Sequence, residues 1–210
     1  MKRAFIFILG IIILFGCSQK LITDWTKLEY TERSFSKIVV VGISKNLEAR
    51  LKFEKDAVKR LKKSGVNAIP GINIFPENLS GDEDLENIIK ILKTENIDGV
   101  ITMSTVDIAE TTRYQPGETQ IVPGGYGHFG KYYYQRYAAI HSPGYFIDSK
   151  SYLIEAILYD LKGGKYEEKE ALVWTGQSSL VDPTSIESAS ENFTKKLVGH
   201  LIGQEIIKVD

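Results

Sequence analysis

Hydrophobic positions in the first half of the chain follow two different periods, and the changes between them predict the elements. The stretch 37–44 reads KIVVVGIS, with four β-branched residues in succession, which is typical of a strand buried on both faces. In 46–65 the apolar residues recur on one helical face. Asn46 and Gly65 stand where an N-cap and a left-handed C-terminal residue belong. The pattern predicts a strand followed by an amphipathic helix.

The same alternation continues for another fifty residues. The segment 66–76 reads as a short strand interrupted by Pro70, and 99–108 reads as a third strand. Between them, 82–95 has the apolar spacing of a helix, preceded by the capping-box pattern from Ser80 to Glu83. Strands that alternate with helices pair in parallel through right-handed crossovers.

The second half of the chain changes character. The segments 151–161 and 169–180 are apolar runs around Gly163-Gly164, which predicts an antiparallel hairpin. Asp182-Pro183 is expected to open a closing helix. We therefore expect one α/β domain: βαβαβ, an insert at 113–149, a β-hairpin and a closing helix, with the helices packed on one mixed sheet.

The first sixteen residues have the pattern of a secretory signal. Lys2 and Arg3 precede an apolar run from Ala4 to Phe15, shorter than the roughly 20 residues needed to span a bilayer. The next residue, Cys17, is the only cysteine of the chain. Without a second cysteine the protein has no internal disulfide, so its stability must come from a packed core.

Leu14, Gly16 and Cys17 resemble the lipobox of bacterial lipoproteins, in which an aliphatic residue and a small residue precede the cysteine. The resemblance implies that 1–16 are removed and that Cys17 carries the acyl chains, palmitate among them, of a membrane anchor. Ser18 after the cysteine implies the outer membrane, with the domain facing the periplasm, or the outer cell surface in a single-membrane bacterium. The alternatives are an ordinary signal peptide with a coincidental cysteine, or an uncleaved short anchor. We read 17–36 as a tether leading into a partial strand, and 37–210 as the domain.

Charge excludes one class of partner. The chain has 26 basic and 27 acidic residues, and removal of Lys2 and Arg3 leaves 24 against 27, a net charge of −3. A chain with this balance has no general attraction for nucleic acid. We expect no nucleic-acid partner.

The insert is rich in tyrosine and glycine. Tyrosine is enriched at recognition surfaces, because it combines a large, stiff contact area with a polar tip. The insert is therefore a candidate partner-binding or glycan-stacking loop. Two alternatives stay open: a β-excursion whose tyrosines pack on the sheet, and a low-complexity segment. The residues expected to bind a protein partner are Tyr126, Tyr132, Tyr133, Tyr134 and Tyr137.

The order of elements and one hairpin phrase resemble a group of small envelope lipoproteins. Their domain is similar to the amino-terminal domain of TolB and to the curli-secretion and penicillin-binding-protein-activator lipoproteins. The resemblance covers about 37–203, and it implies a non-enzymatic protein that anchors, binds partners or helps assemble envelope complexes. The phrase is carried by Tyr159, Asp160, Gly164, Leu172, Val173, Trp174 and Gly176.

Known catalytic motifs are absent from the sequence, and no cofactor is expected. It contains no G-x-S-x-G, Walker A, G-x-G-x-x-G, H-E-x-x-H or C-x-x-C pattern. His128 and His141 would need a third ligand to hold a metal, and exposed loop histidines are the simpler interpretation. The acidic run 82–84 and the basic run 59–63 suit the two ends of helices without any ligand.

We expect a non-catalytic, membrane-anchored lipoprotein that binds a protein partner or helps assemble an envelope complex. One alternative is a cell-wall-directed enzyme with acids such as Asp107, Glu110 or Asp148 at strand ends. Another is a self-assembling structural subunit that uses an exposed sheet edge.

Overall fold

The computed structural model describes residues 21, 23–31, 33–75, 82–129, 131–164, 166 and 168–209. In chain order the elements are β1 (Thr23–Thr26), β2 (Ile38–Ile43), α1 (Leu47–Lys63), β3 (Ala68–Pro70), the 3-10 turn η1 (Gly71–Asn73), α2 (Asp82–Thr94), β4 (Gly99–Gln115), β5 (Glu118–Phe129), β6 (Tyr132–Ser142), β7 (Tyr145–Asp160), α3 (Glu168–Ala171), β8 (Leu172–Val181) and α4 (Ile186–Gly203).

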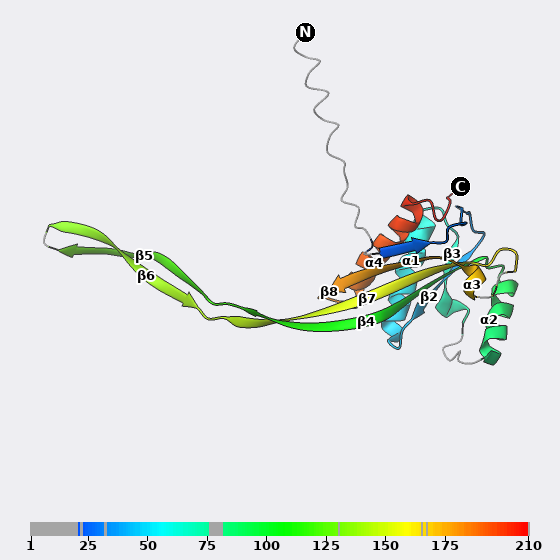
Figure 1. The fold of residues 1–210 in the computed structure, drawn as a ribbon, viewed down its shortest axis with the longest axis horizontal. Coiled ribbons are helices and arrows are strands. Elements are labelled where there is room, and N and C mark those ends of the chain that lie inside the picture. The colour runs from blue at the N-terminus through cyan, green and yellow to red at the C-terminus, as the bar shows by residue number, and fades with distance from the viewer. Residues whose placement is uncertain are drawn as a thin grey trace, which may run out of the picture.

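The described residues form one six-stranded sheet in the order β1-β8-β7-β4-β2-β3, and β5 and β6 form a second sheet of two strands. Figure 1 shows a body in which helices pack on the larger sheet, and a long ribbon that leaves the body and ends in β5 and β6. The predicted fold class, a mixed sheet with helices packed on it and a closing helix, is confirmed.

The parallel part of the sheet consists of β2, β3 and β4. β2 pairs in parallel with both neighbours, so that Ile38 lies opposite Ala68 on one side and Gly99 on the other. Ile38, Val39 and Val40 are all fully buried. This confirms the interpretation of the β-branched run as a strand covered on both faces.

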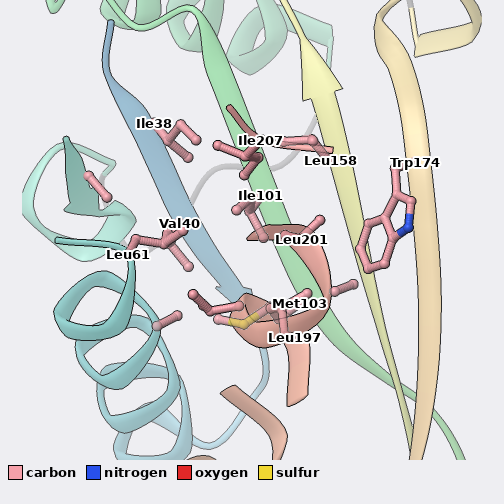
Figure 2. Packing of buried hydrophobic residues seen from close by; sticks show 14 of the residues in the cluster. Ile38, Val40, Leu61, Ile101, Met103, Leu158, Trp174, Leu197, Leu201 and Ile207 are labelled. Atoms are coloured by element: carbon pink, nitrogen blue, oxygen red, sulfur yellow. The ribbon is translucent and has the colours of Figure 1, made fainter. Parts of the chain in front are cut away.

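Two helices cover one face of the sheet. Leu61 of α1 and Leu197 and Leu201 of α4 are fully buried in one cluster with Ile101 of β4 and Leu158 of β7. Figure 2 shows these side chains pointing toward one another between the helices and the strands. The opposite face is covered by α2 and α3, in a second cluster made of the alternate strand residues.

The predicted hairpin is confirmed as the pair β7 and β8, which run antiparallel with Ala156 opposite Gly176. Gly163 and Gly164 in the connection both have positive φ, +79° and +75°, a conformation that glycine adopts without steric cost. The short helix α3 lies in the same connection, between the turn and β8.

Trp174 and Gly176 of the hairpin phrase form one packing unit. The Trp174 side chain is fully buried. A Cβ atom on residue 176 would lie 2.6 Å from the indole atom Cη2 and 2.8 Å from Leu21 Cδ1, so only glycine fits beside this ring. The pair is therefore explained by core packing.

The amino-terminal segment packs against this part of the core. β1 lies within 17–36, the stretch expected to act as a tether, and pairs antiparallel with β8. Leu21 and Phe35 are buried, and Arg33 Nη1 lies 3.0 Å from Oδ2 of the buried Asp160. The folded body thus extends back to Leu21. Among the described residues, no helix is long and apolar enough to cross a bilayer.

A buried carboxylate joins α1 to the end of β2 and to η1. Glu54 of α1 is fully buried, and its oxygens accept hydrogen bonds from Gly42 N at 2.9 Å and Ile72 N at 2.8 Å. Arg50 Nε donates to the same carboxylate at 3.0 Å. The charge is thus balanced and both oxygens are bonded, which a buried ion requires.

The helix ends predicted from the sequence are confirmed in part. Asn46 caps α1 by accepting from Ala49 N at 3.0 Å, and Gly65 has φ of +88°, as predicted. α4 begins at Ile186 with Ser185 as its N-cap, so the expected opening at Asp182-Pro183 is wrong. The physical reason is that the Asp182 carboxylate bonds to another part of the chain, described below. The expected capping box involves Ser80, which lies outside the described residues.

Two glycine-to-alanine changes test the packing role of Gly176. Gly176→Ala should lower the free energy of unfolding by about 1–3 kcal/mol, the usual cost of overpacking a core. Urea unfolding measures this change. Gly199→Ala is the matched control, because Gly199 lies within α4 and a Cβ added there would meet no atom within 4 Å. It should raise stability by up to about 1 kcal/mol. Equal effects of the two changes would contradict the packing role.

Candidate functional site

The most distinctive feature of the molecule is the ribbon of residues 105–150, called the arm below. Its inner half is formed by β4 up to Gln115 and by 145–150 of β7, while 151–153, opposite the first arm residues of β4, also pair with β8 in the body. Its outer half is the ladder between β5 and β6, which pair only with each other among the described residues. At about 3.3 Å per residue, the 25 residues from Thr105 to Phe129 give the arm a contour length of about 80 Å. In Figure 1 it projects away from the body.

The arm begins where the body sheet stops supporting it. β2 pairs with β4 as far as Ser104, and the next position, between Thr105 and Asp107, carries a register shift in the β4–β7 ladder. A bulge of this kind bends a strand and increases its twist. Beyond it, one edge of β4 has no partner strand among the described residues.

Cross-strand contacts hold the inner half together. Opposed residues lie on one face of an antiparallel ladder, where their side chains meet. Three successive pairs on one face are Glu110 Oε1 with Lys150 Nζ at 2.7 Å, Thr112 Oγ1 with Asp148 Oδ1 at 2.6 Å, and the rings of Tyr114 and Phe146 with centroids 5.1 Å apart. The hydrogen bond that Lys150 Nζ donates to the Glu110 carboxylate also raises the pKa of Lys150.

A joint separates the two halves of the arm. Pro116-Gly117 and Pro143-Gly144 face each other between the two ladders, so each strand is interrupted at the same level. A Cβ on Gly117 would overlap the backbone of 142–144, and a Cβ on Gly144 would overlap the Tyr114 ring. Proline cannot donate to a ladder, and glycine permits the close backbone approach, so the pairing stops here and resumes beyond.

Asp182 clamps the base of the arm to the body. Its carboxylate accepts from Lys150 N at 2.6 Å and from Ser149 Oγ at 2.8 Å, while Asp182 N donates to Lys150 O at 2.9 Å. The residue has φ of +44°, which Asn and Asp tolerate better than most residues. The backbone hydrogen bond from Lys150, and after it the Ser149 hydroxyl, hold the pKa of Asp182 below its usual value.

Apolar side chains of the arm face solvent. Ile121 is 73% exposed, Phe146 is 71% exposed and Tyr137 is 64% exposed. Further exposed apolar residues of the arm are Val106, Ile108, Tyr114, Ile140 and Tyr145. Single exposed apolar residues are common on proteins, but a series along one ribbon makes the arm a candidate interaction surface.

Charge on the arm is balanced. It has four acidic and four basic side chains among 46 residues, so its formal charge is zero. Such a segment is not steered toward polyanions or polycations. The surface that it presents is apolar and hydrogen-bonding in character.

The tyrosines predicted as partner-binding residues all lie on the outer half of the arm. Tyr126 is on β5, opposite Gln135. Tyr132, Tyr133 and Tyr134 are on β6, and their side chains lie outside the described parts of the chain. Tyr137 is opposite Pro123, and its ring is largely exposed. For Tyr137 this differs from the alternative in which the tyrosines pack on the sheet.

The acids named for the enzymatic alternative also lie on the arm. Asp107 Oδ1 accepts from Ile108 N at 2.8 Å, Glu110 pairs with Lys150, and Asp148 accepts from Thr112. Each carboxylate therefore has a local partner on the exposed ribbon.

The histidines are distributed over three places. His128 lies on β5, and His141 on β6 bonds Thr119 Oγ1 at 3.0 Å. His200 on α4 lies 3.3 Å from the Asp24 carboxylate and packs on the Trp174 ring. Among the described residues, no three His, Cys, Asp or Glu side chains lie close enough to hold a metal. Cys17 lies outside the described residues.

No family model matches the chain, and no curated protein matches it. Solved structures that match the chain include the L103M variant of PelC from Paraburkholderia phytofirmans, described as a dodecamer, with 12% identity and a TM-score of 0.43 over 85% of this chain and 98% of that one. The lipoprotein GNA1162 from Neisseria meningitidis has 13% identity and a TM-score of 0.38, over 80% of this chain and 96% of that one.

A hypothetical protein, CT253 from Chlamydia trachomatis, has 11% identity and a TM-score of 0.30, over 81% of this chain and 92% of that one. At these values the likenesses support no inference about function. The resemblance to TolB and to the curli-secretion and activator lipoproteins is not confirmed by them.

Sequence reasoning located the tyrosines but missed the joint and the clamp. The two Pro-Gly pairs were visible as turn signals, and their symmetric spacing about 130 could have indicated two strands interrupted at one level. No local signal indicates the clamp, because Asp182 and Lys150 are brought together only by the pairing of β7 with β8.

The clamp predicts a dependence on pH. Because the pKa of Asp182 is lowered in the folded state, its stabilising contacts are complete above the ordinary carboxyl value of 3.8 and are lost as the pH falls through the lowered value. In an NMR titration, the Lys150 amide proton should therefore shift with a midpoint below 3.8.

Asp182→Asn should abolish that titration and leave the positive φ in place. Asp148→Asn is the matched control, because Asp148 bonds a side chain of the arm rather than the Lys150 backbone. A midpoint at or above 3.8, or a titration that persists in Asp182→Asn, would refute the clamp.

Proposed function

We propose that the protein is a non-catalytic bacterial lipoprotein, anchored to the cell envelope through a lipid on Cys17, that binds a protein partner with its arm. The single observation that carries the proposal is the arm itself: a long, neutral, two-stranded ribbon with apolar side chains exposed along it. The anchor rests on the lipobox resemblance of Leu14, Gly16 and Cys17.

An isolated two-stranded ribbon is only marginally stable in water, and its open edges are templates for pairing with another chain. A partner that covers the arm would both stabilise the ribbon and prevent its edges from pairing with other chains. The partner class that fits is a protein with an exposed strand or an apolar groove, because such a surface satisfies the free backbone groups as well as the side chains. The outer half, with the five predicted tyrosines, is the proposed contact region.

The anchor position limits where the body lies. Leu21 is buried in the body, so only residues 18–20 separate it from Cys17. Four residue steps span at most about 14 Å. A lipid on Cys17 would therefore hold the body close to the bilayer surface, and the arm would provide reach away from the anchor. The envelope membrane that we propose is the outer membrane, with the domain on its periplasmic side.

The anchor is tested by metabolic labelling with an alkyne-bearing palmitate analogue. The native chain should be labelled and Cys17→Ser should not, because the thiol is the acylation site. Ser18→Ala is the control and should remain labelled. A native product in which residue 17 is unmodified, or in which the first sixteen residues are still attached, would contradict the anchor.

Partner binding is tested by placing a photo-crosslinking amino acid at Ile121 or at Leu28, one at a time, in the acylated full chain. Both positions are exposed, but Leu28 is on the body and Ile121 is on the outer half of the arm. We expect a protein adduct from Ile121 and none from Leu28. Replacing all five predicted tyrosines by serine should reduce the Ile121 adduct at least about tenfold, since aromatic hot spots often contribute about 2 kcal/mol or more each.

The mass of the adduct identifies the kind of partner. An adduct with a different protein supports the proposal, whereas an adduct with a second copy of this chain would favour the self-assembling alternative. Equal adduct yields from Ile121 and Leu28, or no effect of the tyrosine changes, would remove the outer half of the arm from the proposal.

A further inference from the structure

A pocket of about 450 Å³ lies on the α2 face of the sheet, away from the arm. Its walls are mainly apolar: Val41 and Ile43 come from β2, Ile88 and Leu92 from α2, and Phe75 from the segment after η1. The volume falls within the range of about 300–1,000 Å³ that is usual for small-molecule sites. Among the residues that the structure describes, three polar side chains also line it, those of Ser44, Arg50 and Thr102.

The pocket lies at a topological switch of the sheet. From β2 the chain passes through α1 to β3 on one side, and from β3 it passes through α2 to β4 on the other side of β2. The two crossover helices therefore cover opposite faces, and they leave a crevice at the carboxyl ends of β2 and β4. Open α/β sheets bind ligands at such a crevice. A smaller hollow on the other face shares Gly42, Ile43, Ser44 and Arg50 with the pocket.

Arg50 supplies hydrogen-bond donors held in a fixed position at this place, while its charge is paired with that of Glu54. Its Nε donates to Glu54 Oε1 at 3.0 Å, and Glu54 is in turn held by the Gly42 and Ile72 amides. Only 13% of the Arg50 side chain is exposed. Among the described residues, the two terminal Nη atoms of Arg50 have no hydrogen-bond partner. A guanidinium held in this way is preorganised for a carboxylate.

From this arrangement we propose that the pocket binds an amphiphilic anion, with an aliphatic chain between β2 and α2 and a carboxylate on Arg50. A small inorganic anion is not the preferred ligand, since the apolar walls offer it no hydrogen bond. A wholly apolar ligand would leave the terminal Nη donors of Arg50 unused. The inference stands on the pocket and on Arg50 alone, and does not rest on the arm or on the lipid anchor.

The test uses the acylated full chain in lipid nanodiscs and a dodecanoate that bears a photoreactive diazirine. After irradiation, mass spectrometry maps the labelled peptides. We expect labels on the peptides that contain Phe75 or Ile88 and Leu92, with competition by unlabelled decanoate. The methyl ester of the same probe should label these peptides at least about tenfold less, the loss expected when a charge-assisted hydrogen bond is removed.

Two pairs of variants show whether Arg50 and the apolar pocket determine the binding of the probe. Arg50→Gln should reduce the labelling at least about tenfold, whereas Arg60→Gln on the same helix should not, because Arg60 bonds Thr194 and Glu191 instead. Ile88→Trp should fill the pocket and reduce labelling without touching Glu54. Leu85→Trp is its control, since Leu85 is exposed on the same helix and does not line the pocket.

Circular dichroism shows whether the Arg50→Gln variant still folds. If that variant does not fold, the labelling of Ile88→Trp tests whether the ligand occupies the pocket. Labels elsewhere in the chain, equal labelling by acid and ester, or labelling that Ile88→Trp leaves unchanged would each overturn the proposal.

Discussion

The antiparallel ladder between β4 and β7 is the interaction on which the rest of the structure depends. Its inner residues, Ile101 and Met103 on one strand and Ala156 and Leu158 on the other, are buried in the main core. The same two strands continue past Ser104 into solvent without a break in the chain. Because a two-stranded ribbon has little stability of its own, the core supplies the register and the direction that the arm retains.

Three local features accompany the passage of this ladder from the body into solvent. The bulge after Thr105 changes the twist where support from β2 ends, and Asp182 ties the arm's base to the body near the end of β8. The paired Pro-Gly positions then divide the exposed ribbon into two halves with separate ladders. The outer half is therefore the part least constrained by the core, and it is also the part that carries the predicted tyrosines.

The sequence predicted those features whose cause is local. The β-branched run before Gly42, the buried face of α1 at Ala57, Val58 and Leu61, and the turn at Gly163-Gly164 all follow from residues a few positions apart. Leu47 and Leu51, expected on the same helical face, are exposed. Strand β4 was expected to end near Ile108, because alternation of apolar and polar residues fades once neither face is buried. Backbone pairing continues there without that signal, so the segment 113–149 reads as an insert although it is almost wholly strand.

Features that join distant segments of the chain were not predicted, because no local residue pattern marks them. The helical period of α2 predicted an inward face with Leu85, Ile88 and Leu92. Leu92 and Ile88 do pack toward the sheet, but Leu85 is exposed, and nothing local shows that the helix leaves a pocket beside β2. Likewise, Glu54 reads as a surface residue of a charged helix until the turn of η1 brings the Ile72 amide to it. Hydrophobic period determines which face is inward; the placement of a buried charge depends on which backbone amides the tertiary fold leaves without partners.

The pocket and the arm share β4 but depend on different parts of it. Thr102 lines the pocket and is opposite Ile157, well inside the supported sheet, whereas the arm starts after the bulge. The pocket wall is held by Glu54 and α2, while the arm is held by Asp182 and β8. Because interaction energies of sites without shared partners are usually additive, changes at Arg50 should leave the arm's contacts intact, and the two proposals can fail independently.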